Sequence, residues 1–341
     1  MPQMQTNPQR AVIHDRPDAG PPSLDATADV SHVAPEGSLV DVMGGSARHE
    51  IRIHEHGFIA LVDAMPRLVP EGQTGDSAIV QAARVSYGQG TRRLSEDSGL
   101  IRYLLRHRHT TPFEMVEFKF HVAMPIFVAR QWIRHRTANV NEYSGRYSII
   151  KDEFYRPSPD GVRKQSASNR QGGSETFAAD GPGAHGNPAA GEDQAGSEQE
   201  TARAFLDYLD RAEALYEQYE DLTRRGVSRE LARIGLPVSV YTQWYWKCDL
   251  HNILRFLSLR MDSHAQEEIR VYAHAMHRLI EPIVPVTLQA WRDYEFKALR
   301  LTRLEIEAIR SKIGGRGDGS LNTTNRREQQ EWEQKRASLG L

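Results

Sequence analysis

Two stretches of this 341-residue chain carry almost no large apolar side chains, and they limit which parts of the chain can build a core. Residues 1–46 are rich in Pro, Gly, Asp and Ala, and residues 157–197 are rich in Gly, Ser, Ala and Pro. Because such segments cannot bury enough apolar surface to offset the entropy of ordering, we expect a disordered N-terminal extension and a disordered insertion that loops out of the core. The remaining residues predict one domain over 47–300, interrupted by the insertion, and a charged peripheral helix and tail over 301–341.

The cysteine count and the net charge exclude several classes of protein. Cys248 is the single cysteine, so an intrachain disulfide framework and a cysteine-rich zinc site are excluded. The formal net charge of −2 lacks the global basic field that marks many nucleic-acid-binding proteins. The sequence also lacks an apolar run long enough to span a membrane and a secretory signal. We therefore expect a cytoplasmic protein that binds neither a membrane nor nucleic acid.

Three segments have the patterns of β-strands. Residues 115–125 alternate at period two, which places Phe118 and Phe120 on the same face. Residues 51–65 alternate more loosely, and residues 239–250 are rich in β-branched and aromatic side chains. These patterns predict a small antiparallel or mixed sheet.

Helical patterns lie between and beyond these strands. Residues 125–136 begin with a proline, which suits the first turn of a helix. Ser197 and Glu200 have the spacing of a capping box at the start of a long amphipathic helix, and Ser263 is the expected N-cap of a later one. Since the strands and helices do not alternate regularly, the sequence predicts an α+β fold in which helices flank the sheet.

The segment 129–148 concentrates positive charge and contains no lysine. Its charged residues are one glutamate, Glu142, and five basic residues: Arg130, Arg134, His135, Arg136 and Arg146. Arg130 and Arg134 are four apart and would share a helix face. Arginine binds phosphate through two parallel hydrogen bonds, which lysine cannot do. A solvated basic face is the simpler interpretation, but apolar neighbours such as Trp132 and the tight turn permitted by Gly145 favour binding of a phosphate.

Two further arginines are flanked by apolar residues, where an unpaired charge is costly. Arg233 lies in ELARIGLP and Arg260 lies in LSLRMDSHAQ. A buried salt bridge to a local acid such as Asp262 and the binding of an anionic ligand explain this placement equally well. His264 is expected at a helix N-terminus that meets a ligand.

Several residues suggest other chemistry. His107 and His109 form a His-x-His pair and His121 follows nearby, but no third ligand has a recognisable metal-site spacing, so we expect no metal. Ser144 lacks the surroundings of a nucleophilic serine and is expected to donate a hydrogen bond. Cys248 is expected to be a buried structural cysteine.

The pattern Arg-His-Arg, seven residues, Ser over 134–144 resembles the signature of flavin-dependent thymidylate synthases. Five segments in order also resemble that family: HTTPFE, FVARQWIRHR, NEYSGRYS, ELARIGLP and LSLRMDSHAQEEIRVYA. The resemblance covers residues 50–156 and 228–296. It implies a single catalytic α+β domain that assembles as a homotetramer, with active sites built from several chains.

The family resemblance also implies an activity. Members methylate dUMP to dTMP with methylenetetrahydrofolate as the carbon donor and with FAD that NADPH reduces. Such a reaction needs no cysteine nucleophile, because the cofactor supplies the hydride while the protein supplies placement and electrostatics. Two classes of function stay open as alternatives. One is a nucleic-acid-binding module that stacks bases on Trp132 and Tyr143, and the other is a flavoprotein oxidoreductase that transfers no carbon.

Site residues follow from the resemblance, residue by residue. The implied catalytic residues are Arg260, which would polarise the uracil, Ser144 and His109. The implied FAD contacts are Thr111, Arg134, His135, Arg136, Glu142, Asp249, His251 and Arg255. The implied nucleotide contacts are Gln131, Arg134, Glu142, Tyr143, Ser144, Gly145, Arg146, Arg233 and Arg260. Met115 departs from the family pattern, where histidine is common.

Overall fold

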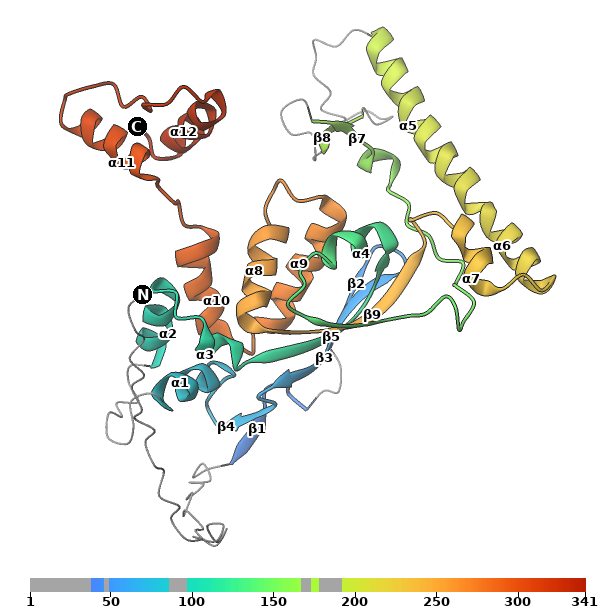
Figure 1. Cartoon of the computed structure of the whole chain (residues 1–341), viewed down its shortest axis with the longest axis horizontal. Helices are drawn as coiled ribbons and strands as arrows, with labels where there is room; N and C mark the ends of the chain where they lie inside the picture. Colours follow the sequence, from blue (N-terminus) through green and yellow to red (C-terminus); the bar gives the residue numbers. More distant parts are fainter. Residues whose placement is uncertain (1–37, 46–48, 86–96, 167–172, 178–191) are drawn as a thin grey trace, which may run out of the picture. The chain divides into compact units, whose positions relative to one another are not determined.

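The centre of the protein is a five-stranded sheet with the strand order β2-β3-β5-β9-β6, in which every neighbouring pair is antiparallel. The computed structural model describes residues 38–45, 49–85, 97–166, 173–177 and 192–341 (Figure 1). The strands of this sheet are β2 (His49–Ile53), β3 (Gly57–Met65), β5 (Glu117–Pro125), β6 (Asn139–Glu142) and β9 (Tyr241–Asp249). The expected α+β fold with an antiparallel sheet is therefore confirmed.

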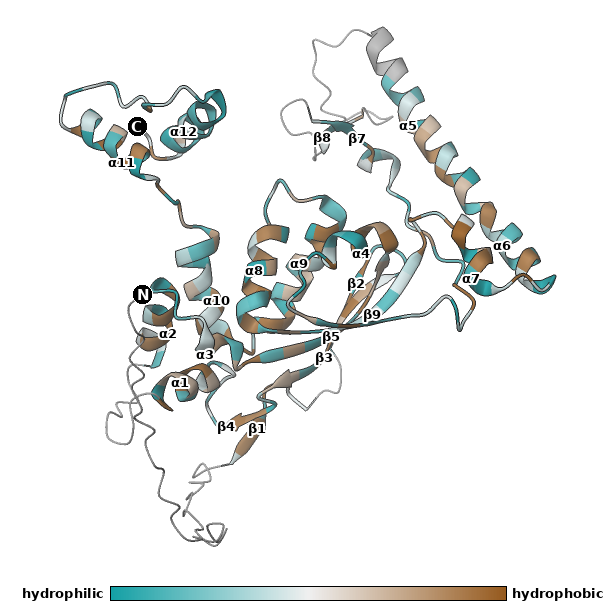
Figure 2. Cartoon of the chain, viewed as in Figure 1, coloured by the Kyte–Doolittle hydropathy of each residue, from teal (hydrophilic) through white to brown (hydrophobic). Residues whose placement is uncertain are grey.

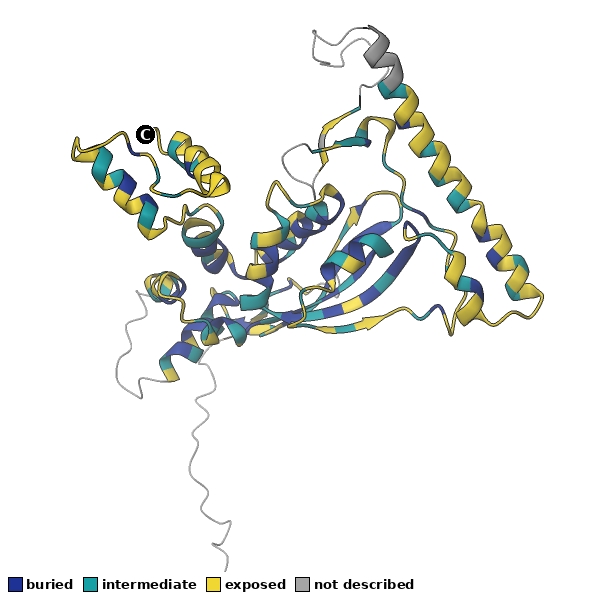
Figure 3. Ribbon diagram, turned by 45° about the horizontal axis from the view of Figure 1, so that its top comes forward, coloured by how far each residue is buried: buried dark blue, intermediate teal, exposed yellow. Residues whose placement is uncertain are grey.

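One face of the sheet carries the hydrophobic core. Phe118 and Phe120 of β5 are fully buried, as their alternation predicted, and lie beside Trp244 and Trp246 of β9. Helices α4 (Ile126–Trp132), α8 (Leu250–Arg260) and α9 (Glu267–Ile280) cover this face. Figure 2 shows hydrophobic residues concentrated on these elements, and Figure 3 shows that the central strands are mostly buried.

A second group of helices packs beside one end of the sheet. It consists of α1 (Asp76–Arg84), α2 (Asp97–Arg106), α3 (Thr111–Glu114) and α10 (Pro285–Trp291). Asp76 joins the first and last of them, because its buried carboxylate accepts hydrogen bonds from the Val286 amide at 2.9 Å and the Thr287 amide at 3.1 Å. These contacts satisfy backbone N–H groups in the first turn of α10, because the amides of a first turn have no carbonyl partner within their own helix.

The predicted N-terminal extension is too long at its C-terminal end. Residues 1–37 lie outside the described residues, but β1 (Leu39–Asp41) pairs with β4 (Leu68–Pro70), and Met43 is 2% exposed. The pairing of β1 with β4 depends on backbone hydrogen bonds, and one methionine is buried nearby. The average composition of residues 1–46 therefore does not predict this ordered part.

The predicted disordered insertion over 157–197 is also wrong for its described residues. It contains a single 3-10 turn (Pro159–Gly161) and the short antiparallel strands β7 (Arg163–Gln165) and β8 (Gly173–Thr176). Helix α5 (Glu192–Glu213) begins before Ser197, so the predicted capping box does not begin the helix. Helices α6 (Leu215–Arg224) and α7 (Arg229–Ala232) follow.

The C-terminal residues form two helices rather than a helix and a tail. Helix α11 (Arg303–Ile313) begins at a capping box, and α12 (Arg326–Ser338) follows it. Trp332 is 1% exposed and donates its indole N–H to the Gly319 carbonyl at 2.8 Å. The Lys335 ammonium lies 2.7 Å from the Glu305 carboxylate. Trp332 therefore supplies a buried apolar contact in a segment whose many charged residues suggested a loose tail.

No helix among the described residues is both long and apolar enough to cross a membrane. The expected cytoplasmic location stays a prediction.

Candidate functional site

Arg260, the last residue of α8, is half-buried and has a hydrogen-bonded guanidinium group. Its Nε donates to Nε2 of His135 at 3.1 Å, and its Nη2 donates to the Gln131 carbonyl at 3.3 Å. The salt bridge to Asp262 that the sequence allowed is not formed, because the Asp262 carboxylate instead accepts the His264 amide at 2.8 Å. Within the described residues no carboxylate neutralises Arg260, and burial lowers its pKa. This charge is therefore available to an anionic group.

His135 is a neutral acceptor for Arg260. Burial lowers its pKa from 6.5 to about 4, and the positive charges of Arg260 and Arg255 act in the same direction. Because Nε2 accepts the hydrogen bond, the proton of the neutral ring is assigned to Nδ1. The edge of the ring packs against Phe256 at 4.9 Å between centroids. His135 therefore orients Arg260 without adding a second positive charge.

The depressed pKa of His135 predicts a pH-dependent stability. As pH falls from 6.5 toward about 4, the unfolded chain binds a proton at His135 that the folded chain does not, so stability is lost in this window. After discounting for solvent screening of a half-buried group, we expect this loss to be on the order of 1 kcal/mol. Urea unfolding at pH 7 and pH 5 measures it. His135→Gln should show a smaller pH difference than the wild type, and an equal difference would contradict the assignment.

The arginines expected on one helix face lie partly beyond the helix. Helix α4 ends at Trp132, so the predicted helical pairing of Arg130 with Arg134 is wrong. The chain turns there, with the His135 amide bonded to the Trp132 carbonyl, and continues into β6, which pairs with β9. Arg130, Arg134 and Arg136 are exposed, and none has an ion-pair partner in the described part of the chain. They leave a positive region open to a ligand.

A tight turn after β6 presents several predicted nucleotide contacts. The Tyr143 amide donates to the Gln243 carbonyl at 2.8 Å, which anchors the turn to β9. The Ser144 hydroxyl accepts the Arg146 amide at 3.3 Å. Within the described residues, no His–carboxylate pair adjoins Ser144, and its role as a hydrogen-bond donor to a ligand stays a prediction. Glu142 accepts the Thr242 hydroxyl at 2.8 Å.

Gly145 brings this turn against a distant part of the chain. A Cβ atom at this buried glycine would lie 2.8 Å from Cδ1 of Ile150 and 3.3 Å from Cδ of Arg233. The absence of a side chain therefore lets Arg233 lie beside the turn. The sequence indicated that Gly145 permits close approach, and the structure identifies Arg233 and Ile150 as the groups that approach.

A cavity of about 530 Å³ beside α8 gathers His109, an implied catalytic residue, with two of the implied FAD contacts, His251 and Arg255. Thr111 does not line this cavity, but its neighbour Thr110 does. Asp249 is also absent from the lining, and instead accepts the Asn252 amide at 2.9 Å as the N-cap of α8.

The cavity also contains residues that the sequence reasoning missed. They are Arg108, Trp291, Glu295 and Arg300. Arg108 has a φ of 60°, an uncommon backbone for a residue other than glycine and one that often marks a functional site. Only the tertiary fold places the end of α10 beside the RHRH segment, so no local signal could have found these residues.

The histidines considered for a metal site do not converge. His107 packs on Tyr103, and His121 bonds Gln243 on the sheet at 3.1 Å, whereas His109 faces the cavity. No group of His, Cys, Asp or Glu among the described residues could hold a metal ion. Cys248 is buried, as expected, and burial raises the pKa of its thiol, which donates to the Thr137 carbonyl at 3.3 Å. That thiol is unsuited to act as a nucleophile.

Comparison with known proteins gives the family of this chain. A family model described as thymidylate synthase complementing protein matches residues 67–286. The flavin-dependent thymidylate synthase of Dictyostelium discoideum is 58% identical over 310 residues, covering 91% of this chain and 94% of that protein. The chain belongs to the flavin-dependent thymidylate synthase family. The family and enzyme class that the motifs suggested are therefore confirmed.

Other members of the family agree with this assignment. The flavin-dependent thymidylate synthase of Gluconobacter oxydans is 50% identical over 76% of this chain and 78% of its own length. The crystal structure of the UMP/dUMP methylase PolB from Streptomyces cacaoi bound with 5-Br dUMP has a TM-score of 0.56 and 31% identity, over 72% of this chain and 98% of that one. This chain thus shares the fold of PolB over most of its length and has segments that PolB lacks.

Proposed function

We propose that this enzyme methylates dUMP to dTMP, with methylenetetrahydrofolate as the carbon donor and NADPH as the reductant of bound FAD. The observation that carries the proposal is Arg260, a half-buried guanidinium that is oriented by His135 and Gln131 and has no carboxylate partner among the described residues. Such a group, held in place before the substrate binds, stabilises negative charge that develops on a substrate. The PolB complex with 5-Br dUMP supports a uracil nucleotide as that substrate.

The residues beside α8 fit a flavin. A cavity of about 530 Å³ is within the range typical of small-molecule sites, and it combines the apolar side chains of Leu254 and Leu259 with the polar groups of His109 and Arg255. The exposed guanidinium groups of Arg134 and Arg136, which have no ion-pair partner in the described residues, suit a pyrophosphate. When bound, reduced flavin supplies the hydride of the reaction.

The chain's own residues supply orientation and charge. Arg260 would donate to the uracil carbonyl and stabilise the anionic base. Ser144, Gly145 and Arg146 would bind the nucleotide in their turn, with Arg233 beside them. Because the Cys248 thiol is buried and its pKa raised, the reaction would proceed without a cysteine nucleophile.

The groups described above fall into two sets, the turn at Ser144 and the Arg260 group with the cavity. Arg255 connects the Arg260 group to the cavity, since it lines the cavity and its charge acts on His135. In contrast, no hydrogen bond or ion pair joins the turn at Ser144 to Arg260 within the described residues. We infer that each active site combines these groups from different copies of the chain, as in the homotetramer that the family resemblance implies.

An anaerobic assay tests the proposed function. The purified protein is incubated with dUMP, methylenetetrahydrofolate and NADPH, and nucleotides are separated by chromatography. We expect dTMP only when all three compounds are present. Oxidation of NADPH without dTMP in the complete mixture would instead identify an oxidoreductase that transfers no carbon. A colourless protein that binds oligonucleotides with a steep salt dependence would support the nucleic-acid-binding alternative.

A further inference from the structure

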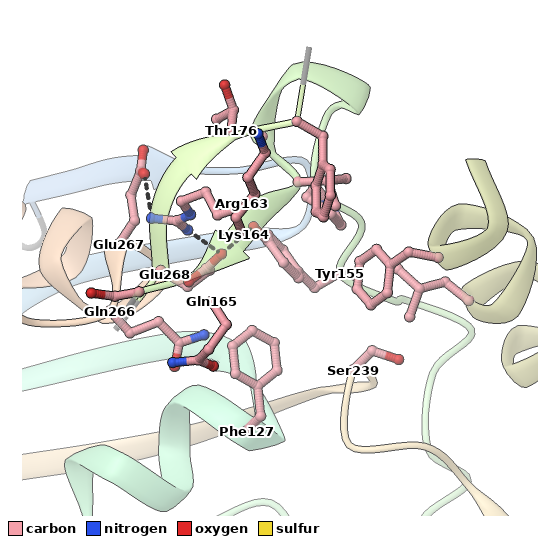
Figure 4. Close-up of a pocket in the computed structure, with 18 of the residues that line it drawn as sticks. Phe127, Tyr155, Arg163, Lys164, Gln165, Thr176, Ser239, Gln266, Glu267 and Glu268 are labelled. Carbon is pink, nitrogen blue, oxygen red and sulfur yellow. Dashed lines mark hydrogen bonds and ion pairs between the residues drawn. The ribbon is translucent and has the colours of Figure 1, made fainter. Parts of the chain in front are cut away.

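The insertion contacts the helix that follows Arg260, and this contact extends to the candidate active site. A cavity of about 1090 Å³ lies among the β7–β8 ribbon, α5 and the start of α9. Figure 4 shows Arg163 of β7 in this cavity, directed toward Glu267 and Glu268 in the first turn of α9. The insertion therefore provides a charged group to a helix that covers the central sheet.

Both terminal nitrogens of the Arg163 guanidinium group pair with carboxylates in the first turn of α9. Nη1 lies 2.7 Å from the Glu267 carboxylate, and Nη2 lies 2.9 Å from the Glu268 carboxylate. Glu268 is only 7% exposed and also accepts the Tyr155 hydroxyl at 3.0 Å. Burial raises the pKa of Tyr155, which keeps its hydroxyl protonated as a donor. Among the described residues Arg163 is the only ion-pair partner of the buried Glu268, so its removal would leave that carboxylate buried and unpaired, a strongly unfavourable state.

The turn held by Arg163 continues directly into the active-site contacts. Gln266 precedes α9 as its N-cap residue, and its side-chain carbonyl accepts a hydrogen bond from the side-chain amide of Gln131. The backbone carbonyl of Gln131 in turn accepts from Arg260 at 3.3 Å. A displacement of the first turn of α9 would therefore shift Gln131, and with it one of the two groups that orient Arg260.

We propose that Arg163 is a positioning residue, which fixes the first turn of α9 and thereby the Gln266–Gln131–Arg260 contacts that receive the nucleotide. This inference rests on the proposed function. It assigns to the insertion a role in nucleotide binding, although the composition of the insertion suggests a dispensable loop. The fork of arginine is needed because it reaches two carboxylates at once, whereas lysine offers a single point charge.

The test compares three variants at this contact, Arg163→Ala, Arg163→Lys and Glu267→Gln, with one matched control. Arg163→Ala removes both ion pairs. Glu267→Gln removes one of them at a half-exposed position and leaves Glu268 paired, so it provides a variant that folds if Arg163→Ala does not. Arg156→Ala is the control, because Arg156 precedes the insertion and pairs with Asp210 and Glu213 of α5 instead of α9.

Binding of dUMP is measured by titration calorimetry, together with kcat, KM for dUMP and flavin content. We expect Arg163→Ala to lower kcat/KM for dUMP by about 10- to 100-fold and to weaken dUMP binding, with flavin content within about twofold of wild type. Glu267→Gln should act in the same direction with a smaller effect, Arg163→Lys should restore only part of the loss, and Arg156→Ala should resemble wild type.

The outcomes separate this inference from the proposed function. If the wild-type protein binds dUMP and both Arg163→Ala and Glu267→Gln bind it equally well, the positioning role of Arg163 is wrong and the proposed function stands. If the variants lose flavin and dUMP binding in equal measure with Arg156→Ala, the insertion acts on general stability and the inference is also wrong. If the wild-type protein itself does not bind dUMP, both proposals are overturned.

Discussion

Replacement of Arg260 by alanine should lower turnover of dUMP by about 100- to 1,000-fold, the cost typical of removing one donor aimed at a developing negative charge. The side chain is half-buried, and its guanidinium is oriented by His135 at 3.1 Å and by the Gln131 carbonyl at 3.3 Å. Since these contacts exist before a substrate binds, no reorganisation is needed during the reaction. Flavin content should change by less than about twofold, because Arg260 does not line the cavity beside α8.

The measurement is a single-turnover assay with the flavin reduced beforehand, together with the flavin absorbance of the purified protein. Arg260→Lys keeps the charge but loses the fork that reaches both partners, so it should recover little activity. Arg224→Ala is the control, since Arg224 is exposed on α6 and pairs only weakly with Asp221 at 3.7 Å. If Arg260→Ala converted dUMP at the wild-type rate, the role assigned to Arg260 would be wrong.

The largest effect on stability is expected from Gly57→Ala, at the start of β3. A Cβ atom there would lie 2.3 Å from the Tyr272 hydroxyl oxygen and 2.5 Å from the Ile53 carbonyl oxygen. The Tyr272 hydroxyl cannot withdraw cheaply, because it is buried and donates to the Ala123 carbonyl at 2.8 Å. We expect the free energy of unfolding to fall by about 3 kcal/mol, from overpacking together with loss of a buried hydrogen bond.

Urea unfolding of the wild type and variants measures this change. Gly99→Ala is the matched control, because Gly99 lies in α2 with no atom within 4 Å of an added Cβ. That control should stabilise the protein by about 0.5–1 kcal/mol, since it reduces the entropy of the unfolded chain. Combining Gly57→Ala with Tyr272→Phe should cost less than the sum of the two single changes, because the second change relieves one of the two clashes. Strict additivity would show that Tyr272 is not the obstacle.

The strands were the most predictable part of the fold. The period-two alternation of β5 identified Phe118 and Phe120 as core residues, and both are fully buried. The aromatic and β-branched composition of β9 was likewise sufficient to predict a strand. A strand that is buried on one face has apolar residues at the positions that face the core, so its own sequence identifies it.

Helix ends were less predictable. Helix α4 stops at Trp132 and α9 starts at Glu267, although the sequence favoured Arg136 and Ser263. At the end of α4 the Gln131 carbonyl accepts a tertiary hydrogen bond from Arg260, so local signals for a helix end compete there with tertiary contacts. The candidate site was affected directly, because the early end of α4 separates Arg130 from Arg134.

The sequence by itself determined the family, the alternating core strands and the types of side chain at the site, because these depend on residue identity at short spacing. Only the tertiary structure decided that Arg260 has His135 as its neighbour and, among the described residues, no carboxylate partner, and that Arg163 pairs the insertion with α9. The reason is physical. Each of these contacts joins residues about a hundred positions apart in the sequence. Two charged groups interact strongly only when the fold brings them within a few ångströms and removes the water between them, and the sequence alone does not show which groups these are.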